Sequence, residues 1–409
     1  MSIEEALLQL EQQQKLQVED VFTPNLPSTK NFFCGRENEV LAIIEGIISS
    51  KANLLVYGDR GIGKTSLAKY SCGILSDRFQ IQNHYYSCSE ESSFETVMSV
   101  FFADLKIDIE DTITTTKRIE GSVGFKGILG ANTSGEETAE VITKRKFEDV
   151  SWVAKKLKNA PNIILLIDEF DKIKNSNEKG KFATLMKLLS DYESAIKLIV
   201  VGVAHDAGEL MDGHESVVRC LREVGLPRMA QEELLEILTR GQERLGITFE
   251  NNVRNHIVAD SDGFPYFTHL LALETVKVAI SQNKKTANIN DYKQGVSNAV
   301  CAQDNALQKK ISDVLSNKNE ETQKKLLIAS AMIGNLEFTS IQWKDKYTNL
   351  FGENIEQGKV NSLMVKAIKD DNSSVYRRLT QGRYFFVDPR MPIYIKLKYA
   401  NRGDKKEVL

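Results

Sequence analysis

The sequence predicts an α/β fold: a parallel sheet sandwiched by helices, followed by an α-helical lid and a C-terminal winged helix-turn-helix domain. Three observations predict it. A glycine-rich loop follows a short apolar run at 54–66, a longer apolar run at 162–169 ends in two carboxylates, and amphipathic patterns give way to a basic hairpin after residue 305. The 409 residues are enough for two or three domains with their own cores.

The glycine-rich loop is the strongest of these signals. Apolar residues 54–57 indicate a short buried strand, and residues 58–65 match the pattern G-x-x-x-x-G-K-[ST] at every fixed position. Glycines let backbone N–H groups turn inward at the start of the next helix, where Lys64 can reach the β- and γ-phosphates and the Thr65 hydroxyl can bind Mg²⁺. The sequence therefore predicts a P-loop NTPase whose nucleotide contacts are Gly58, Asp59, Arg60, Gly61, Ile62, Gly63, Lys64, Thr65 and Ser66.

The composition is ordinary for a soluble protein, with 42% hydrophobic and 27% charged residues and a net charge of −3. No apolar run approaches the roughly eighteen residues of a membrane span, and the acidic N-terminus lacks the apolar core of a signal peptide. The five cysteines are isolated, which is typical of reduced thiols rather than of disulfides or a zinc site. We therefore expect a cytoplasmic protein with no membrane partner.

The segment before the phosphate loop divides into two parts. Residues 1–31 are expected to form a short helix, over 3–17, and a proline-punctuated tether. The P-loop ATPase core, 32–229, is expected to begin with a Gly-Arg turn that leads into an apolar-periodic helix. Arg36, in that turn, could wall the base side of the nucleotide; an ordinary helix start is the other interpretation.

Residues 110–147 interrupt the predicted core. Threonines there give way to four glycines spaced by three residues. We expect an inserted hairpin or mobile loop, which could contact a partner or a neighbouring subunit, or could be a plain surface insertion.

The carboxylates Asp168 and Glu169 end the second motif. Five apolar residues before them predict a central parallel strand that is buried on both faces, and such strands place ligand-binding groups at their carboxyl ends. Asp168 is suited to hold Mg²⁺ through water. Glu169 could orient the water that attacks the γ-phosphate, or accept its proton.

Two further sets of polar residues follow predicted strands. His205 and Asp206 come after the buried strand at 196–203 and could sense the γ-phosphate, or could lie in a plain loop. Arg219 and Arg222 come next, and either could act as an arginine finger toward a neighbouring protomer's nucleotide. Surface arginine is the alternative interpretation.

Residues 230–304 have the apolar periodicity of helices and predict a lid over the nucleotide. Pro265 stands at the head of one of these helices, a position that proline tolerates. We expect Pro265 and its neighbours to lie near the base or the sugar.

The C-terminal segment, 305–409, predicts the winged helix. An amphipathic pattern at 360–368 is followed by two β-rich runs around Thr380-Gln381-Gly382, which has the chemistry of a hairpin turn. This segment holds nineteen Lys and Arg against twelve Asp and Glu, about +7, so the rest of the chain carries about −10. The module could bind duplex DNA, dock a protein or pack on its own ATPase.

Together with the winged-helix tail at 305–409, five stretches resemble the origin-recognition and cell-division-control-like branch of the AAA+ ATPases and its STAND-type bacterial relatives. They are FCGRENE at 33–39, YGDRGIGKTSLA at 57–68, LLIDEFD at 165–171, the arginines before LPRM at 226–229, and GFPYFTHLL at 263–271. The resemblance implies ATP as the nucleotide, Asp168 and Glu169 as metal-site and catalytic carboxylates, Arg219 or Arg222 as the finger, and ATP-dependent homo-oligomers.

Two departures from this pattern imply slow turnover. Initiator ATPases of this branch carry a lid arginine where this chain has Gly263-Phe264-Pro265, which is closer to STAND ATPases, whose proline packs against adenine. The strand that ends at Val203 also lacks the usual asparagine. Since no effector motif is visible, an effector would be a separate chain.

The first hypothesis is thus an ATP- and Mg²⁺-dependent molecular switch that oligomerises and recruits DNA or a partner protein, in a context such as antiviral defence or genome maintenance. The second is a DNA-binding initiator or loader whose winged helix grips the duplex. The third is a nucleotide-stabilised scaffold that hydrolyses almost no ATP.

Overall fold

The structure is a computed structural model, which describes residues 18–24, 33–48, 52–107, 147–204, 207–211, 221–302, 305–315, 319–368 and 374–400. Within these ranges no helix is both long and apolar enough to cross a membrane. The chain forms two compact units. One comprises Glu37–Gly58 and Leu67–Leu226, and the other Met1–Arg36, Asp59–Ser66 and Pro227–Leu409.

The first unit is built on a five-stranded sheet with the strand order β2-β3-β4-β1-β5. Every neighbouring pair of strands is parallel. Strands β1, β3 and β4 are buried along nearly their whole length because continuous apolar runs suit strands covered on both faces. The strands span Asn53–Gly58 (β1), Gln82–Ser87 (β2), Ile163–Asp168 (β3), Lys197–Val203 (β4) and Leu221–Leu226 (β5).

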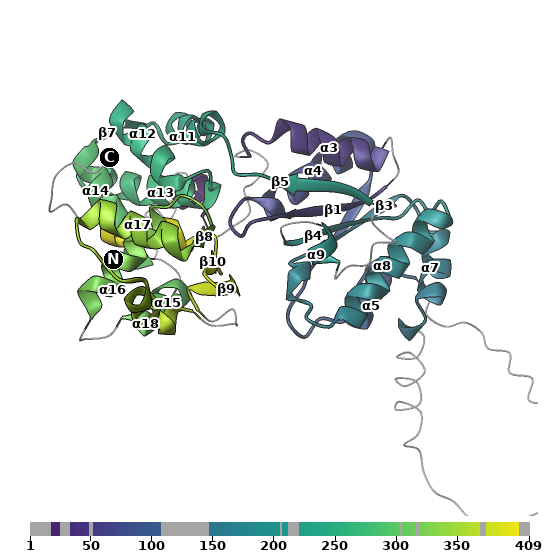
Figure 1. Ribbon diagram of the computed structural model, residues 1–409. Helices are drawn as coiled ribbons and strands as arrows, with labels where there is room; N and C mark the ends of the chain where they lie inside the picture. Colours follow the sequence, from purple (N-terminus) through teal and green to yellow (C-terminus); the bar gives the residue numbers. More distant parts are fainter. Residues whose placement is uncertain are drawn as a thin grey trace, which may run out of the picture. The chain divides into compact units, whose positions relative to one another are not determined.

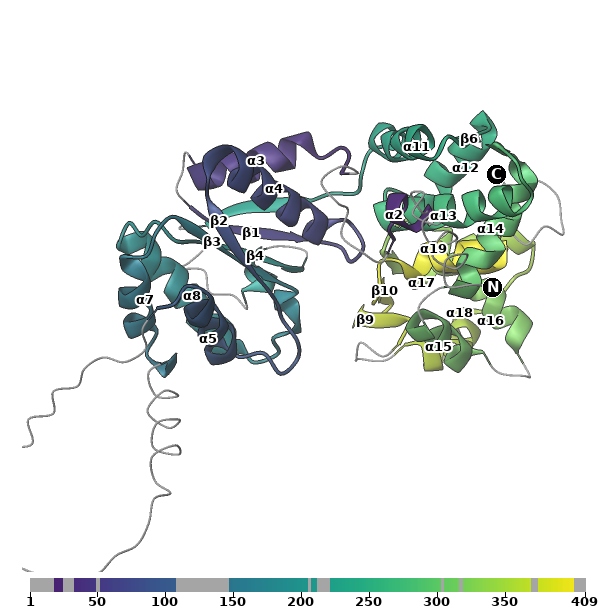
Figure 2. The ribbon, with the colours of Figure 1, turned by 180° about the vertical axis from the view of Figure 1, so that it is seen from behind.

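Helices cover both faces of this sheet, as predicted. Helices α3 and α4 lie on one face, and α5, α7 and α8 lie on the other (Figure 1 and Figure 2). The second face holds a large apolar core in which Phe94 and Phe182 meet with ring centroids 4.9 Å apart. The helices span Glu37–Ile48 (α3), Lys64–Phe79 (α4), Phe94–Asp104 (α5), Val150–Lys158 (α7), Ser176–Asp191 (α8) and Ala207–Leu210 (α9), with a 3₁₀ turn at Phe170–Lys172 (η1).

The insertion predicted at 110–147 lies outside the described residues except for its last residue. Phe147 is buried and packs edge-on against Phe102 and Trp152, with ring centroids 5.3 and 5.9 Å away. It therefore belongs to the apolar core, because its ring completes an aromatic cluster that the glycine pattern could not reveal.

The second unit contains the helical region and the short helix α2, Val18–Val21. Phe22, just after α2, packs where Gly241 has no side chain, and a Cβ at Gly241 would collide with its ring. Phe22 also meets Phe249 and His269, with ring centroids 6.4 and 6.1 Å away. The helix predicted over 3–17 lies outside the described residues. The helical region predicted at 230–304 comprises Gln231–Leu245 (α11), Asn251–Ser261 (α12), Pro265–Ser281 (α13), Ile289–Ala302 (α14) and the strand pair Thr248–Phe249 (β6) and Thr286–Ala287 (β7).

The C-terminal part of this unit carries an antiparallel sheet with the order β8-β10-β9. The predicted hairpin is present, and Gly382 turns it with a φ of +78°. The amphipathic run at 360–368 is not one helix, since α18 ends at Leu363 and a 3₁₀ turn follows. The elements are Asn305–Val314 (α15), Glu320–Ala331 (α16), Glu337–Thr339 (β8), Ser340–Phe351 (α17), Gln357–Leu363 (α18), Val365–Ala367 (η2), Tyr376–Thr380 (β9), Arg383–Phe386 (β10), Met391–Ile395 (α19) and Lys396–Ala400 (η3).

Candidate nucleotide-binding site

The predicted phosphate loop connects the end of β1 to the start of α4 at Lys64. Gly58, Gly61 and Gly63 have φ angles of 149°, 83° and 98°, which glycine adopts readily and other residues do not. The first turn of α4 has no acidic residue, so nothing in that turn neutralises the positive end of the helix dipole. Thr65 and Ser66 lie in that turn.

Lys64 is 8% exposed, and its Nζ donates a hydrogen bond to the Asp59 carbonyl at 2.7 Å. The lysine therefore closes over its own loop. A cationic Nζ, glycine-permitted backbone turns and an unneutralised helix N-terminus are the donor set that a nucleoside triphosphate requires, so the loop fits such a ligand.

Pro265 lies beside this loop in the same compact unit. It is the first residue of α13, as predicted, and a Cβ placed on Gly63 would lie 3.7 Å from its Cγ. A Cβ on Gly61 would lie 3.4 Å from Tyr266 Cβ and 3.4 Å from Arg390 Cδ. The loop is thus flanked by the head of α13 and by a C-terminal residue that sequence reasoning missed.

Arg228 holds the turn that carries Pro265. Its guanidinium pairs with Asp262 at 2.8 Å and lies over the Phe264 ring, 4.9 Å from the centroid. The next residue, Met229, donates its N–H to the Gly263 carbonyl at 2.9 Å. These contacts fix the turn because Gly263, at φ +79°, has no side chain to block Arg228. No sequence pattern indicated this role for Arg228.

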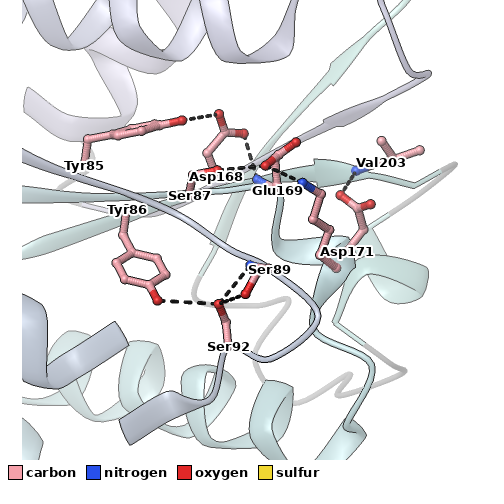
Figure 3. A network of polar contacts seen from close by, with 10 residues as sticks. Tyr85, Tyr86, Ser87, Ser89, Ser92, Asp168, Glu169, Asp171 and Val203 are labelled. Carbon is pink, nitrogen blue, oxygen red and sulfur yellow. Dashed lines mark hydrogen bonds and ion pairs between the residues drawn. The ribbon is translucent and has the colours of Figure 1, made fainter. Parts of the chain in front are cut away.

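Asp168 is buried at the carboxyl end of β3, where the sequence predicted it (Figure 3). Its Oδ2 accepts a hydrogen bond from the Tyr85 hydroxyl at 3.1 Å, and its Oδ1 accepts the Glu169 N–H at 2.8 Å. Burial, and then the charge of Asp168, raises the pKa of Tyr85 to about 12. Tyr85 therefore keeps its proton and donates, while the Lys69 ammonium lies 3.8 Å from its ring centroid.

Glu169 has a left-handed backbone, with φ +55°, and its side chain is held by two neighbours. Its Oε2 accepts from the Ser87 hydroxyl at 2.7 Å (Figure 3). The same oxygen accepts from the Lys172 ammonium at 2.7 Å. Ser87 ends β2 and is in register with Asp168. Sequence reasoning missed Tyr85, Ser87 and Lys172. The polar residues that end the run at 82–87 were the available signal, but the register of the strands was needed to use it.

The end of β4 is tied to the carboxylate segment. The Val203 N–H donates to Asp171 Oδ1 at 2.8 Å, and Gly202 allows this approach because a Cβ there would lie 3.2 Å from that oxygen. Since β1, β3 and β4 are parallel, their carboxyl ends lie at one edge of the sheet. His205 and Asp206, the predicted phosphate sensors, follow β4 but lie outside the described residues.

The predicted arginines have local partners where they are described. Arg222, on the edge strand β5, pairs with Glu45 Oε2 at 3.0 Å, while Arg219 lies outside the described residues. Arg36 is buried with φ +62°; its side chain donates to the Pro227 carbonyl at 2.6 Å and its N–H to Glu233 at 2.7 Å. The nucleotide contact expected of Arg36 stays a prediction.

The fold places the chain in a known class. It resembles the ORC1 protein of Aeropyrum pernix in complex with DNA (15% identity, TM-score 0.50, 94% of this chain and 98% of that one). It also resembles the ORC2 protein of the same organism in its ADPNP-ADP complexes (14%, 0.51, 93% and 97%) and CDC6p of Pyrobaculum aerophilum (12%, 0.50, 93% and 97%). The chain therefore has the fold of an ORC/CDC6-like AAA+ P-loop ATPase.

The family follows from the sequence itself. The sequence-family model of novel STAND NTPase 1 matches residues 22–367, so the chain belongs to that family. A curated relative, ORC1-type DNA replication protein 2 of Thermoplasma acidophilum, is 22% identical over 182 residues, which is 41% of this chain. The match spans about a third (35%) of that relative's length.

Proposed function

We propose that the chain is an ATP-driven molecular switch that binds ATP with Mg²⁺, hydrolyses it slowly and changes its assembly state as it does so. The observation that carries the proposal is the network at the carboxyl end of β3, where a fixed, buried Asp168 stands beside a Glu169 that Ser87 and Lys172 hold. Both carboxylates are present, but Glu169 must leave Ser87 and Lys172 before it can act as a base.

The roles of the residues follow from their chemistry. Backbone N–H groups of residues 58–66 and the Lys64 ammonium bind the phosphates, and Thr65 and Asp168 hold Mg²⁺. When bound, Mg²⁺ neutralises charge on the phosphate oxygens. Glu169 takes a proton from water at a carboxylate oxygen. Pro265, and Arg36 in its turn, contact the base side of the nucleotide.

Slow turnover follows from how Glu169 is held. A carboxylate that accepts hydrogen bonds from a hydroxyl and an ammonium has those lone pairs occupied and is fixed in one direction. Lys172 and Glu169 are each 43% exposed, so their pair contributes only about 0.2 to 1 kcal/mol and can open. The closed pair would therefore reduce the fraction of chains in which Glu169 can act, and with it the rate of hydrolysis, by about two- to fivefold, which lengthens the ATP state.

Assembly is proposed to use an arginine finger from Arg219 or Arg222. Arg222 would have to leave Glu45 to serve, which favours Arg219. The C-terminal segment is proposed to be a winged helix that recruits DNA or a separate effector protein. The order α16-β8-α17-α18-β9-β10 and the sheet order β8-β10-β9 support this assignment. A role in bacterial defence or genome maintenance is part of the proposal.

A second candidate function is a DNA-binding initiator-like ATPase. The exposed basic residues of the C-terminal domain include Lys359, Lys366, Arg377 and Arg378, which could contact phosphates. The similar ORC1 protein of A. pernix was solved with DNA. Affinity for duplex DNA that falls steeply with salt would favour this candidate.

Oligomerisation tests the switch. Light scattering of the full chain should report larger assemblies with ATP and Mg²⁺ than without, and Lys64→Ala should abolish the difference. Assembly that is the same in wild type and Lys64→Ala, with or without ATP, would contradict the switch. Co-purified nucleotide with no turnover would instead favour the third candidate, a nucleotide-stabilised scaffold.

A further inference from the structure

Two neighbouring tyrosines of the edge strand β2 point to opposite sides of the strand (Figure 3). Tyr86 packs edge-on against Phe101 of α5, with ring centroids 6.3 Å apart, and its hydroxyl lies 3.5 Å from Ser92 Oγ. Tyr85 faces α4, where the Lys69 ammonium lies 3.8 Å from its ring centroid. Because successive residues of a strand alternate between its faces, only Tyr85 can reach the groups on the α4 side.

Asp168 is a buried carboxylate that uncharged donors hold. It is 3% exposed, and within the described residues its oxygens accept from the Tyr85 hydroxyl at 3.1 Å and from the Glu169 N–H at 2.8 Å. Buried charges in proteins are paired with an opposite charge or coordinate a metal ion. Each carboxylate oxygen has two lone-pair sites, so these hydrogen bonds leave one site on each oxygen. The arrangement therefore fits a carboxylate whose balancing cation is a bound metal ion.

Tyr85 determines how Asp168 presents its remaining sites. The hydrogen bond from its hydroxyl restrains the rotation of the carboxylate, and partners that orient a metal-binding group in this way usually contribute to metal affinity. Tyr85 is 40% exposed, so core packing does not account for its place. Instead the Lys69 ammonium attracts the face of the ring. Lys69 follows Thr65 by four residues on α4, so it shares a helix face with the other residue proposed to hold Mg²⁺.

We propose that Tyr85 is a positioning residue for the Mg²⁺ site, and that it sets how strongly Mg²⁺ strengthens the binding of the nucleotide. Its hydroxyl orients Asp168, and Lys69 holds its ring. Ser87, two residues along on the same face of β2, restrains Glu169. One face of β2 thus orients both carboxylates. The inference rests on the proposed function, because it requires that Asp168 holds Mg²⁺ beside bound ATP.

The test measures the mant-ATP affinity of the full chain by fluorescence titration, once in excess EDTA and once in excess MgCl₂. The dissociation constant in EDTA divided by that in MgCl₂ gives the coupling between Mg²⁺ and nucleotide. Tyr85→Phe should lower this ratio about 3- to 10-fold, as expected for one hydrogen bond, and should leave the affinity in EDTA unchanged. Tyr86→Phe loses the same hydroxyl on the opposite face and should change neither value. An unchanged or higher ratio in Tyr85→Phe would overturn the proposal.

A second pair of variants tests the ring from its other side without altering β2. Lys69→Met removes the cation over the Tyr85 ring and should lower the ratio about twofold, whereas Lys69→Arg keeps a cation there and should not. Equal ratios in these two variants would overturn the role of Lys69. Thermal unfolding in EDTA without nucleotide shows whether each variant is folded, and the Lys69 variants decide the proposal if Tyr85→Phe is not.

Asp168→Asn separates a failure of the inference from a failure of the proposed function. If the ratio falls in Asp168→Asn but not in Tyr85→Phe, the Mg²⁺ site stands and Tyr85 does not position it. If Asp168→Asn leaves the ratio unchanged, Asp168 does not hold Mg²⁺. The role that the proposed function gives to Asp168 is then wrong, and the inference is overturned with it.

Discussion

Each compact unit holds a carboxylate-cation pair beside residues predicted to bind the nucleotide, and the two pairs differ in burial. Glu169 and Lys172 are each 43% exposed, and their pair spans one turn of 3₁₀ helix. Asp388 and Arg390 are exposed by only 10% and 8% and share three hydrogen bonds. Both are pairs of a carboxylate with a cation, but water reaches the first pair and protein surrounds the second.

The difference indicates which group can move. An exposed pair is solvated when it opens, so Glu169 can leave Lys172 at little cost and act on a substrate. A buried pair that opens leaves two desolvated charges, so Arg390 stays beside Asp388 unless another anion takes part. Under the proposed function, Glu169 is therefore a releasable base, whereas the buried pair of the other unit stays closed.

The largest effect is expected at the releasable base. Glu169→Gln should lower ATP turnover by about 10²- to 10⁴-fold, because the amide cannot accept a proton, while mant-ATP affinity stays near that of the wild type. An assay of phosphate release measures the turnover, and fluorescence titration measures the mant-ATP affinity. Glu193→Gln, an exposed residue in the turn before β4, is the matched control and should leave turnover unchanged. Turnover retained in Glu169→Gln would remove Glu169 from the chemistry.

The fixed pair should respond in stability instead. Asp388→Asn leaves the Arg390 guanidinium buried without its carboxylate, which costs about 3 to 5 kcal/mol where such a pair is broken. The urea transition of the second unit should move to lower concentration. Adding Arg390→Met should restore much of the loss, since the charges are then balanced. Equal midpoints for wild type and Asp388→Asn would mean that the pair is solvated.

The buried His269 makes the free energy of unfolding depend on pH. Burial lowers the pKa of His269 to about 4, and its Nδ1 accepts the Thr23 N–H at 3.3 Å. Because the folded pKa lies below the ordinary value, the stability it contributes is full above about pH 6.5 and is lost as the pH falls toward 4. The loss should reach about 2 kcal/mol at pH 5. Urea midpoints at pH 7.5 and 5 measure it, and His269→Gln should show a smaller change.

The smallest effect is expected from opening the exposed pair. Lys172→Met and Ser87→Ala should each raise ATP turnover about two- to fivefold, because each removes a restraint on Glu169 worth about 0.2 to 1 kcal/mol. Single-turnover hydrolysis separates this from product release. Lys174→Met, two residues along, is the control for charge. A fall in turnover in both variants would mean that Ser87 and Lys172 position Glu169 for the reaction rather than restrain it.

Local patterns predicted much of the fold. The apolar runs at 54–57 and 163–167 predicted the central strands because a strand buried on both faces needs little beyond continuous hydrophobicity. The glycine pattern gave the loop, since φ values of 83° and 98° at Gly61 and Gly63 demand glycine. Pro265 was correctly predicted at the head of a helix because proline lacks the N–H that such a position leaves unused.

The contacts that complete the site could not be predicted in this way. Tyr85 reaches Asp168 only because β2 and β3 pair in one register, and Arg390 reaches Gly61 only because the C-terminal domain packs in the same unit as the loop. Phe22 fits over Gly241 for a similar reason. Each contact joins residues far apart in sequence, and the sequence around either residue does not predict its partner.

The most direct test of the central claim is ATP turnover by the full chain at moderate salt, with and without duplex DNA, using Lys64→Ala as the blank. A nucleotide switch with a restrained Glu169 predicts slow turnover that requires Lys64 and is the same with and without DNA. Turnover that rises with DNA would favour the initiator-like function over the switch. Equal turnover in wild type and Lys64→Ala would contradict the nucleotide site itself.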